Sequence, residues 1–510
     1  MAAEVTVILD DRTPPPSEIT AILGPIRFTE IIRRRRRLMD EIEAAVTELG
    51  NGVTLELLRD EAEATAFVRR VEERGTGPLY LRLPSPIMPL RLAGLTGLID
   101  KARYGIESVL VSSIQDDEAV TLMTAMDAIT LLRASDSASR RAHLLSLAES
   151  VPRLVDYLDF IDLRKPRDLL RFLSGSTEGR HFNVLHAKNG ILQKSSADTE
   201  KMRAEYAYFQ AAPEKMRRFL VPTFDYWEKA GRAGYAMEHL AIPDTALQFI
   251  HGAFSPEDFD LLLDQVFAYF VSRPPVGGSP EASVLWQRQI TDKMHSRLIR
   301  LNDTAQGAKL DAILRAARPD FSLKNMRERA DSLLAAFAPS GGRCKSGDEV
   351  ALFSHGDLCF SNILFDRRLG LMRLIDPRGA TTADEAAMHP LYDVAKVSQC
   401  VLGGYDFVNN GRFACDLDDT LSLRLTLGAP ARREYEESRP SVPQGPPDWA
   451  QAAFKQRLAL IGLDVPRVRA VELSLFLSML PLHIDRPSKL AGFALIAADV
   501  IDVLETGKAS

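Results

Sequence analysis

Cysteine is scarce in this chain, and no two cysteines are spaced as a metal site or a redox pair requires. The 510 residues include four cysteines, Cys344, Cys359, Cys400 and Cys415, and none belongs to a C-x-x-C motif. This usage excludes a disulfide framework and a cysteine-based zinc site, and it favours reduced thiols. We therefore expect a cytoplasmic protein.

An excess of charge of one sign and long apolar runs are also missing. The formal net charge is −6, with 63 basic and 69 acidic residues, so we expect no nucleic-acid partner. The most apolar stretch near the C-terminus, Leu473–Ile484, contains Pro481 and is shorter than the roughly 20 residues of a membrane helix. We therefore expect no integral membrane segment. Acidic residues stand where a secretory leader would be basic, and we expect no signal peptide.

Repeats and low-complexity linkers are absent, although the length suggests roughly two to four domains. Apolar residues make up 46% of the chain and charged residues 26%, which is typical of a soluble globular protein. Strands and helices alternate over residues 1–135, which predicts a small, largely parallel α/β domain, and residues 136–165 suggest a helical connector. The expected strands are Val5–Leu9, Val53–Leu58, Leu79–Leu83, Ser108–Val111 and Ile129–Leu132.

No glycine-rich phosphate-binding loop follows the first of these strands, so a nucleotide-sugar site in this domain would be degenerate. Asp10 and Asp11 end that strand, where α/β sheets often bind ligands, but a turn before Pro14–Pro16 is the favoured interpretation. Arg33–Arg37 is a run of five arginines in a stretch that predicts an amphipathic helix over residues 31–49. A solvated helix face is favoured there over a phosphate or polyanion site.

A stretch that combines apolar and acidic residues, 351–379, stands out in the second half of the chain. It reads ALFSHGDLCFSNILFDRRLGLMRLIDPRG and predicts a strand, a loop, a short strand and a second strand that ends at Asp376. Asn362 follows Asp357 by five residues, and Asp376 follows it by 19. Phosphoryl transfer needs a carboxylate to orient and deprotonate a hydroxyl, and it needs oxygen ligands for Mg²⁺. These three residues meet both needs.

The stretch His355–Asn362 matches the H-G-D-x-x-x-x-N loop of the aminoglycoside phosphotransferase and choline kinase-like enzymes. Leu374–Asp376 looks like the metal-binding strand end of that family. Pro390–Lys396 resembles the stretch that follows it, with His389 where the family has an aspartate. From about residue 166 onward the chain therefore resembles this family.

The resemblance implies an α+β, bilobal, protein kinase-like fold, with an N-lobe over residues 166–245 and a C-lobe with a helical insert over residues 246–510. It also implies ATP and Mg²⁺ as cofactors. Asp357 would be the catalytic base, and His355 in the same loop would brace it. Asn362 and Asp376 would hold Mg²⁺. The nucleotide-binding residues that the resemblance implies are Gly175, Ser176, Thr177, Lys194, Glu205, Glu238 and Leu240.

Glu205 is the favoured partner of Lys194 because it shares a helix face with Met202 and Phe209, which places it at the edge of the core. Glu200 is the rival partner. The pair would hold the lysine ammonium over the ATP phosphates, and the backbone at Glu238 and Leu240 would bind the adenine.

The function that the resemblance implies is transfer of the ATP γ-phosphate to a hydroxyl of a small molecule, such as a sugar, polyol or amino alcohol. Its fusion to an α/β domain resembles proteins linked to bacterial capsule or surface-polysaccharide synthesis. Arg378 could bind an anionic group of the acceptor, although an ion pair with Asp384 or Glu385 is favoured.

Two alternatives remain open. One is a nucleotidyltransferase-type enzyme with its chemistry in residues 1–135 and an accessory kinase-like domain. The missing phosphate loop argues against it. The other is a pseudokinase scaffold, and the presence of Lys194, Asp357, Asn362 and Asp376 together argues against that.

Overall fold

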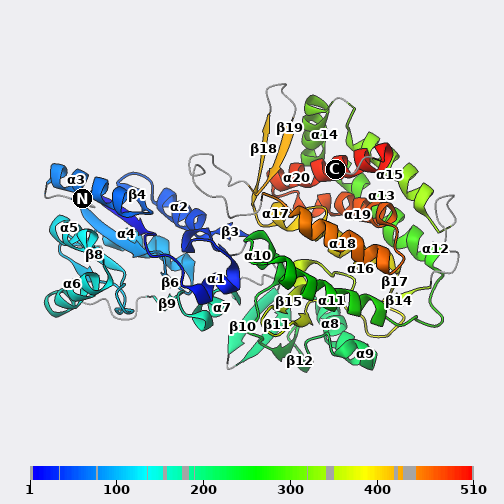
Figure 1. The fold of residues 1–510 in the computed structure, drawn as a ribbon, viewed down its shortest axis with the longest axis horizontal. Coiled ribbons are helices and arrows are strands. Elements are labelled where there is room, and N and C mark those ends of the chain that lie inside the picture. Colours follow the sequence, from blue (N-terminus) through cyan, green and yellow to red (C-terminus); the bar gives the residue numbers. More distant parts are fainter. Residues whose placement is uncertain are drawn as a thin grey trace. The chain divides into compact units, whose positions relative to one another are not determined.

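The chain folds into two compact units, Met1–Ser176 and Thr177–Ser510 (Figure 1). The computed structural model describes residues 4–33, 35–75, 78–134, 136–152, 158–174, 183–188, 190–318, 320–339, 350–417, 423–428 and 444–507. Within these ranges no helix is long and apolar enough to cross a membrane.

The first unit is built on a five-stranded sheet with the strand order β4-β1-β5-β8-β7. Its strands are β1 (Val5–Asp10), β4 (Val53–Leu58), β5 (Leu79–Pro84), β7 (Val109–Leu110) and β8 (Thr121–Met123). β1 pairs in parallel with β4 and β5, whereas β8 runs antiparallel to both β5 and β7. The sheet is therefore mixed, and only its β4-β1-β5 part has the parallel arrangement that the alternating pattern predicts.

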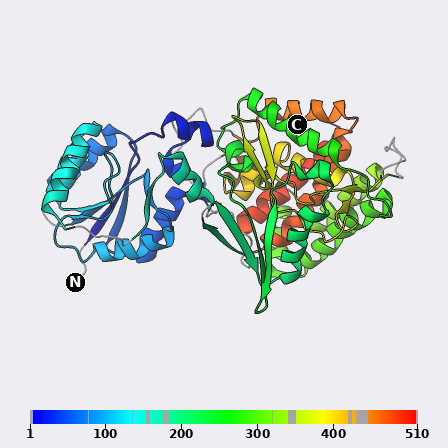
Figure 2. The same cartoon turned by 90° about the horizontal axis from the view of Figure 1, so that it is seen from below.

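Helices cover both faces of this sheet (Figure 2). They are α2 (Leu38–Leu49), α3 (Glu61–Arg74), α4 (Leu95–Ala102), α5 (Ala125–Arg133) and α6 (Ser137–Ser150). α3 buries Ala64, Phe67, Val68 and Val71, a spacing that gathers its apolar side chains on one face. Together with Ile8 and Tyr80 of the sheet, these residues belong to the main core cluster of the unit.

Smaller elements complete the first unit. These are α1 (Ser17–Leu23), η1 (Phe28–Glu30), β2 (Ile32–Arg33), β3 (Arg36–Arg37), β6 (Ile87–Pro89), η2 (Leu92–Gly94), β9 (Phe160–Asp162) and α7 (Pro166–Ser174). β9 pairs with β6, and Leu144 of α6 packs in the main core cluster. The contacts thus join residues 136–174 to the first unit, whereas the sequence suggested a connector over 136–165 and the start of a kinase-like lobe at 166.

Two sequence predictions for the first unit are wrong. Ile129–Leu132 lies in helix α5, because Thr124 caps that helix by accepting a hydrogen bond from the Asp127 backbone N–H, and Ala128, Leu131 and Leu132 form a helical apolar face. The helix expected from residue 31 begins at Leu38, and the arginine run before it forms the β2–β3 hairpin, with Arg35 at a φ of 61°.

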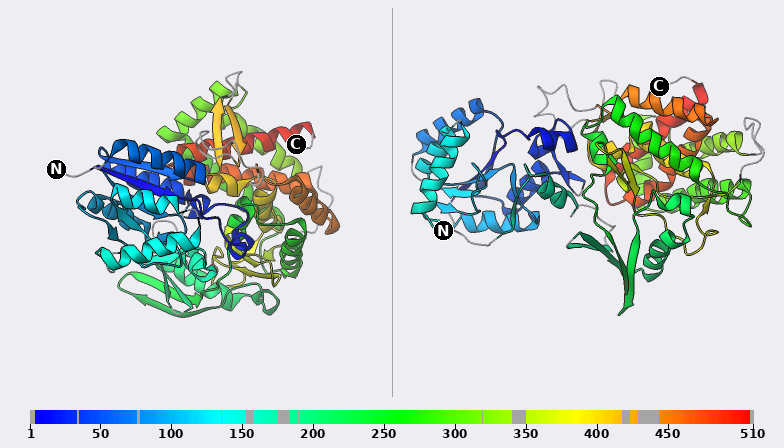
Figure 3. Two further views of the ribbon diagram at one scale, coloured as in Figure 1. Left: turned by 60° about the vertical axis from the view of Figure 1, so that its left-hand side comes forward. Right: turned by 60° about the horizontal axis from the view of Figure 1, so that its bottom comes forward.

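The second unit begins with a four-stranded antiparallel sheet in the order β10-β11-β13-β12 (Figure 3). Its elements are β10 (Asn183–Lys188), β11 (Ile191–Ser196), α8 (Thr199–Ala211), α9 (Glu214–Arg217), β12 (Thr223–Lys229) and β13 (Arg232–Glu238). Met202 of α8 packs with Tyr235 and Met237 of β13 in one core cluster. This packing fixes α8 against the sheet.

The rest of the second unit is mainly helical. Its helices are α10 (Thr245–Ile250), α11 (Pro256–Ser272), α12 (Ala282–Leu285), η3 (Trp286–Thr291), α13 (Asp292–Asn302), α14 (Ala305–Ala317), α15 (Leu323–Phe337), η4 (Phe360–Asn362), α16 (Leu391–Val401), α17 (Tyr405–Asn409), α18 (Asp448–Leu460), α19 (Val465–Met479), η6 (Leu480–His483) and α20 (Pro487–Thr506). α19 is buried along almost its whole length and packs against α16 and α20, so it forms the centre of this part.

Three two-stranded sheets lie among these helices. They pair β14 (Leu352–Phe353) with β17 (Ala387–Met388), β15 (Ile363–Asp366) with β16 (Leu371–Leu374), and β18 (Phe413–Leu417) with β19 (Leu423–Leu427). The first two frame the loop that carries Asp357, which confirms the strand, loop, strand and strand order expected for residues 351–376.

Candidate active site

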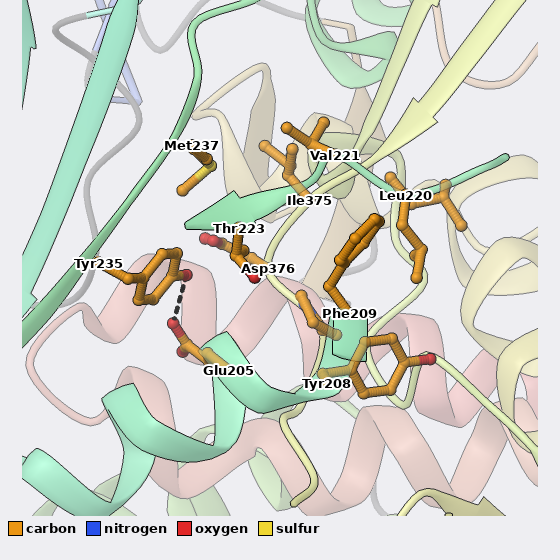
Figure 4. Close-up of a pocket in the computed structure, with 12 residues that line it drawn as sticks. Glu205, Tyr208, Phe209, Leu220, Val221, Thr223, Tyr235, Met237, Ile375 and Asp376 are labelled. Carbon is orange, nitrogen blue, oxygen red and sulfur yellow. Dashed lines mark hydrogen bonds between the residues drawn. The ribbon is translucent and has the colours of Figure 1, made fainter. Parts of the chain in front are cut away.

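Lys194 and Glu205 form a buried ion pair between the sheet and α8. Lys194 lies on β11 opposite Tyr235 of β13, and its Nζ is 2.7 Å from Glu205 Oε2. The Tyr235 hydroxyl donates to the same Glu205 oxygen at 3.0 Å (Figure 4). Both members of the ion pair are buried. The structure therefore joins Lys194 to Glu205, as the helix-face argument predicted, and not to Glu200.

Asp376 brings the second carboxylate to the same lysine. Its Oδ1 lies 2.8 Å from Lys194 Nζ, and its backbone has a φ of 54°, in the left-handed region. Burial alone would lower the pKa of Lys194, but the attraction of Asp376 and Glu205 raises that pKa to about 12. Lys194 is therefore a permanent cation held between two acids from distant parts of the unit.

A small pocket opens beside these charges (Figure 4). Glu205 and Asp376 form its polar part. Its apolar wall includes Val221, Met237 and Ile375. Asp357 does not line this pocket, and neither do Glu238 and Leu240. The pocket is thus adjacent to the lysine and distinct from the place where the catalytic loop presents its carboxylate.

Asp393 holds the start of the catalytic loop. Its Oδ2 accepts the His355 backbone N–H and its Oδ1 accepts that of Gly356, each at 2.8 Å. The Tyr269 hydroxyl donates to Oδ2 at 2.9 Å, and Arg273 lies 3.8 Å from it. Because Asp393 is completely buried, these partners fix it firmly, and it in turn fixes the backbone that leads into Asp357.

His355 is uncharged and stabilises this loop through hydrogen bonds. Its Nδ1 accepts the Asp357 backbone N–H at 3.3 Å, so Nε2 carries the proton and donates to the Ile375 carbonyl at 3.0 Å. Burial lowers the pKa of His355. The ring therefore ties the loop to the strand end that carries Asp376, as expected, and both of its nitrogens are occupied.

Asp357 is partly exposed and pairs with Lys396 of α16. The distance from its Oδ1 to Lys396 Nζ is 2.9 Å, and 44% of the Asp357 side chain is exposed. Asn362 Nδ2 donates to the Asp357 carbonyl at 2.8 Å, which closes the loop on itself. Burial would lower the pKa of Lys396, but the attraction of Asp357 outweighs it and raises that pKa. A charged lysine thus favours the ionised carboxylate that a catalytic base requires.

Asn362 and Asp376 have the donor atoms that Mg²⁺ prefers. The amide nitrogen of Asn362 is directed to the Asp357 carbonyl, which leaves its Oδ1 as a ligand atom, and Asp376 offers carboxylate oxygens. No group of three or more His, Cys, Asp and Glu side chains suited to a metal occurs within the ranges described. A magnesium ion here would therefore take its other ligands from substrate phosphates and water.

The remaining nucleotide-binding predictions lie at the end of β13 and before β10. Glu238 is the last residue of β13, and the backbone N–H and C=O of Leu240 form no hydrogen bond with any residue in the described ranges. Gly175, Ser176 and Thr177 lie outside the described residues. Leu173 and Ser174, which resembled the start of a phosphate-covering hairpin, belong to helix α7.

Three residues near Asp357 were missed by the sequence interpretation. Tyr269 of α11 and Arg273, which directly follows that helix, contact Asp393 from more than 100 positions away, and no local pattern marks them. Lys396 lay within the motif that was recognised, without an assigned role. Its position on a buried apolar helix, where an unpaired lysine is costly, was the signal that could have identified it.

Arg378 follows Asp376 and points to solvent. All of Arg378, Asp384 and Glu385 are described, and no ion pair joins the arginine to either acid. Glu385 instead accepts hydrogen bonds from the Thr381 backbone and hydroxyl. The expected salt bridge is therefore not formed.

In the first unit, the acids at the end of β1 take part in ion pairs and hydrogen bonds. Asp10 lies 2.7 Å from Arg82 and 2.9 Å from Arg12, and Asp11 accepts a hydrogen bond from Thr29. Arg33, the first residue of the arginine run, is buried. It donates to the carbonyls of Phe172 and Leu90, at 3.2 Å and 2.9 Å. These charges hold the unit together.

Solved structures similar to this chain are small-molecule kinases. Aminoglycoside phosphotransferase APH(4)-Ia is 13% identical with a TM-score of 0.38, and the match covers 65% of this chain and 93% of that one. Choline kinase from Cryptosporidium parvum is 13% identical with a TM-score of 0.31, over 64% and 87%. Aminoglycoside-3'-phosphotransferase of type VIII is 13% identical with a TM-score of 0.33, over 58% and 90%.

No family model matches the chain, and no curated protein does. With identities and TM-scores this low, the structural matches carry no argument about activity. The function is therefore argued from the chain's own residues.

Proposed function

We propose that the protein is an ATP- and Mg²⁺-dependent phosphotransferase that acts on a hydroxyl of a small molecule. The observation that carries the proposal is the convergence on Lys194 of Glu205 and Asp376, from α8 and from the end of the β15–β16 hairpin. Asp357 and Asn362 lie on the loop that leads into this hairpin. A cation fixed by a glutamate, beside a metal-binding aspartate and a separate carboxylate base, is the arrangement that phosphoryl transfer requires.

In the proposed reaction, Asp357 accepts a hydrogen bond from the acceptor hydroxyl and takes up its proton. The hydroxyl oxygen forms a bond to the γ-phosphorus of ATP while the bond from that phosphorus to the β–γ bridging oxygen breaks. ADP leaves with the electron pair of the broken bond, and the acceptor leaves as a phosphate monoester. Lys194 stabilises negative charge on the phosphates.

Asn362 Oδ1 and Asp376 would hold Mg²⁺, which when bound supplies positive charge beside the transferring phosphoryl group. Asp393 and His355 act as positioning residues. They fix the backbone on either side of Gly356, so that Asp357 is presented at one place. Lys396 keeps the Asp357 carboxylate ionised until the acceptor proton is transferred.

The acceptor in this proposal is a sugar, polyol or amino alcohol, and the setting is the cytoplasmic synthesis of surface-polysaccharide precursors. The backbone at Glu238 and Leu240 would bind the adenine, and Gly175, Ser176 and Thr177 would cover the phosphates. Residues 177–510 contain all of these groups except Gly175 and Ser176.

A nucleotidyltransferase centred on the first unit is disfavoured because Asp10 is already neutralised by Arg12 and Arg82.

Nucleotide binding by Lys194→Met tests the proposal, with Lys201→Met as the matched control. Both lysines lie near Glu205, but Lys201 is exposed and its Nζ is 3.5 Å from Glu205 Oε1. We expect Lys194→Met to weaken Mg·ATP binding by at least about 10-fold, because a charge-assisted contact to the phosphates is lost, and Lys201→Met to leave it unchanged. Isothermal titration calorimetry gives both affinities. Equal ATP affinity in the two variants would contradict the proposed nucleotide site.

A further inference from the structure

Four basic residues come from segments that meet near Asp357. Lys396 contacts it directly at 2.9 Å. Tyr392 lies one helical turn before Lys396 on α16, and Lys293 of α13 donates a hydrogen bond to the Tyr392 hydroxyl, with its Nζ 4.9 Å from the ring centre. Arg297 lies one turn after Lys293 on α13, and Arg378 is the fourth. Three separate segments thus bring basic residues to the neighbourhood of Asp357.

Arg378 is held beside Asp357 by its backbone. Its N–H donates to the His355 carbonyl at 2.9 Å. A Cβ built on Gly356 would lie 2.9 Å from the Arg378 Cβ, so the two residues are in direct contact next to Asp357. The guanidinium is exposed and has no hydrogen bond or ion pair with any residue whose position is described. Its five donors are therefore available to a ligand.

Lys293 lies among basic side chains, which disfavour its protonated form. Burial, together with the neighbouring Lys396, Arg378 and Arg297, lowers its pKa to about 6 against the attraction of Asp357. The structure describes no carboxylate paired with Lys293. An anion placed between Lys293 and Arg378 would favour the protonated form of Lys293, and it would meet the permanently charged guanidinium of Arg378.

We propose that the acceptor of the phosphotransferase carries an anionic group, a phosphate or a carboxylate, that binds between Arg378 and Lys293 while its hydroxyl faces Asp357. Arg378 is the main contact, because a guanidinium binds two oxygens of such a group at once. Lys293, which becomes protonated beside the anion, supplies the second contact, and Arg297 raises the local potential from the next turn of α13. A cationic acceptor would meet like charges on these segments.

This inference rests on the proposed function, since it places the anion in the acceptor position. The rival role for the same cations is to bind the γ-phosphate of ATP. The two roles separate when the nucleotide position is occupied, because an anion that still binds must then use the acceptor position.

The test is phosphate binding to full-length protein saturated with Mg²⁺ and the ATP analogue AMP-PNP, measured by calorimetry. The probe is inorganic phosphate, with acetate as the carboxylate probe and tetramethylammonium as the cationic one. The variants are Arg378→Met and Lys293→Met. Arg368→Met, an exposed arginine in the β15–β16 turn, is the matched control.

We expect phosphate or acetate to bind the wild type, and to bind each variant at least about 10-fold more weakly, with AMP-PNP affinity unchanged and Arg368→Met like wild type. The anion that binds with the higher affinity identifies the anionic group of the acceptor as a phosphate or a carboxylate. If neither anion binds, if both variants bind them as wild type does, or if the variants lose AMP-PNP affinity instead, the inference is overturned. If the wild type does not bind AMP-PNP, the proposed function itself fails.

Discussion

The residues around Asp357 differ sharply in how their charge is balanced. Lys396 is close to the carboxylate of Asp357, and that contact raises its pKa. Lys293 donates a hydrogen bond to the neutral hydroxyl of Tyr392, and burial together with neighbouring cations lowers its pKa to about 6. In the folded protein at neutral pH, one lysine of the site is therefore fully charged and the other has largely lost its proton.

This difference predicts how stability depends on pH. The pKa of Lys293 in the unfolded chain is about 10.4, so between pH 6 and pH 10 the unfolded state binds more protons than the folded state. The contribution of Lys293 to the free energy of unfolding therefore increases as pH rises through this window. Lys293→Met removes the contribution, and we expect the variant to be more stable than wild type at pH 7 and the difference to shrink towards pH 10.

Chemical denaturation of both proteins between pH 6 and pH 10 checks this prediction, with Arg368→Met as the control for loss of one positive charge. A difference in stability between Lys293→Met and wild type that does not change with pH would mean that Lys293 keeps its proton in the folded protein.

Local sequence was sufficient to predict which residues of the loop 355–362 and of the strand end at Asp376 come together, but it was insufficient for the residues that surround them. Asp357 and Asn362 precede the β15–β16 hairpin and Asp376 follows it, so their spacing predicts their proximity. Glu205 could be chosen over Glu200 because of its helix face. Lys293 comes from a helix that meets Asp357 only through tertiary packing, and no sequence period indicates that meeting.

At the scale of elements, the segment after Asp376 is packed closely against α8. The Ala380 N–H donates to the Ala204 carbonyl at 3.0 Å. Gly379 has a φ of 88°, and a Cβ on it would lie 2.9 Å from the backbone nitrogen of Glu205. The absence of a side chain at Gly379 thus allows α8 to bring Glu205 to Lys194.

Gly379→Ala should therefore lower activity, since α8 must move for the new methyl group to fit. We expect ATP turnover to fall by about 10-fold or more. Gly370→Ala is the matched control, because Gly370 also has a positive φ, 59°, but nothing lies within 4 Å of its added Cβ. That variant should lose about 1 kcal/mol of stability and keep its turnover. Steady-state kinetics of the two variants decide the point, and equal turnover would show that α8 is not positioned by this contact.

Some elements could not be predicted because short apolar runs fit more than one structure. The sequence of Ile129–Leu132 is compatible with a buried strand and with one turn of a buried helix. The N-cap at Thr124 and the packing of Leu131 in the core favour the helix, α5. The arginine run is compatible with a helix by propensity. Burial of Arg33 against the carbonyls of Phe172 and Leu90 overrides that propensity and favours the hairpin.

At the scale of the whole molecule, the two units differ in what their buried charges do. In the first unit Arg82 is buried between Asp10 and Glu118, at 2.7 Å and 2.6 Å. The sequence predicted the α/β character of this unit and its first three strands. It could not predict that Arg82 would neutralise Asp10, because Arg82 reaches the end of β1 only in the folded unit.

Arg82→Met should destabilise the first unit and leave phosphotransfer intact. Removing the arginine leaves the buried Asp10 with Arg12 alone and the buried Glu118 with Arg140 at 3.8 Å, which costs about 3–5 kcal/mol. Arg70→Met, at a surface pair with Glu56, should cost less than about 1 kcal/mol. We expect an early unfolding transition in the calorimetric trace of Arg82→Met, with ATP turnover per molecule unchanged at temperatures below it. Loss of turnover while the first unit is still folded would place part of the chemistry in that unit.

The most direct test of the proposed activity is ATP-dependent formation of a phosphorylated product by wild type and Asp357→Asn. Purified protein with Mg²⁺ and ATP would be supplied with sugars, polyols, amino alcohols and their phosphorylated or carboxylated forms, and the product identified by mass spectrometry. We expect a monophosphorylated acceptor with wild type, and with Asp357→Asn a rate lower by about 100-fold or more at unchanged ATP affinity. A product that forms equally fast with Asp357→Asn would contradict the mechanism, and failure of the wild type to bind ATP would contradict the proposed function.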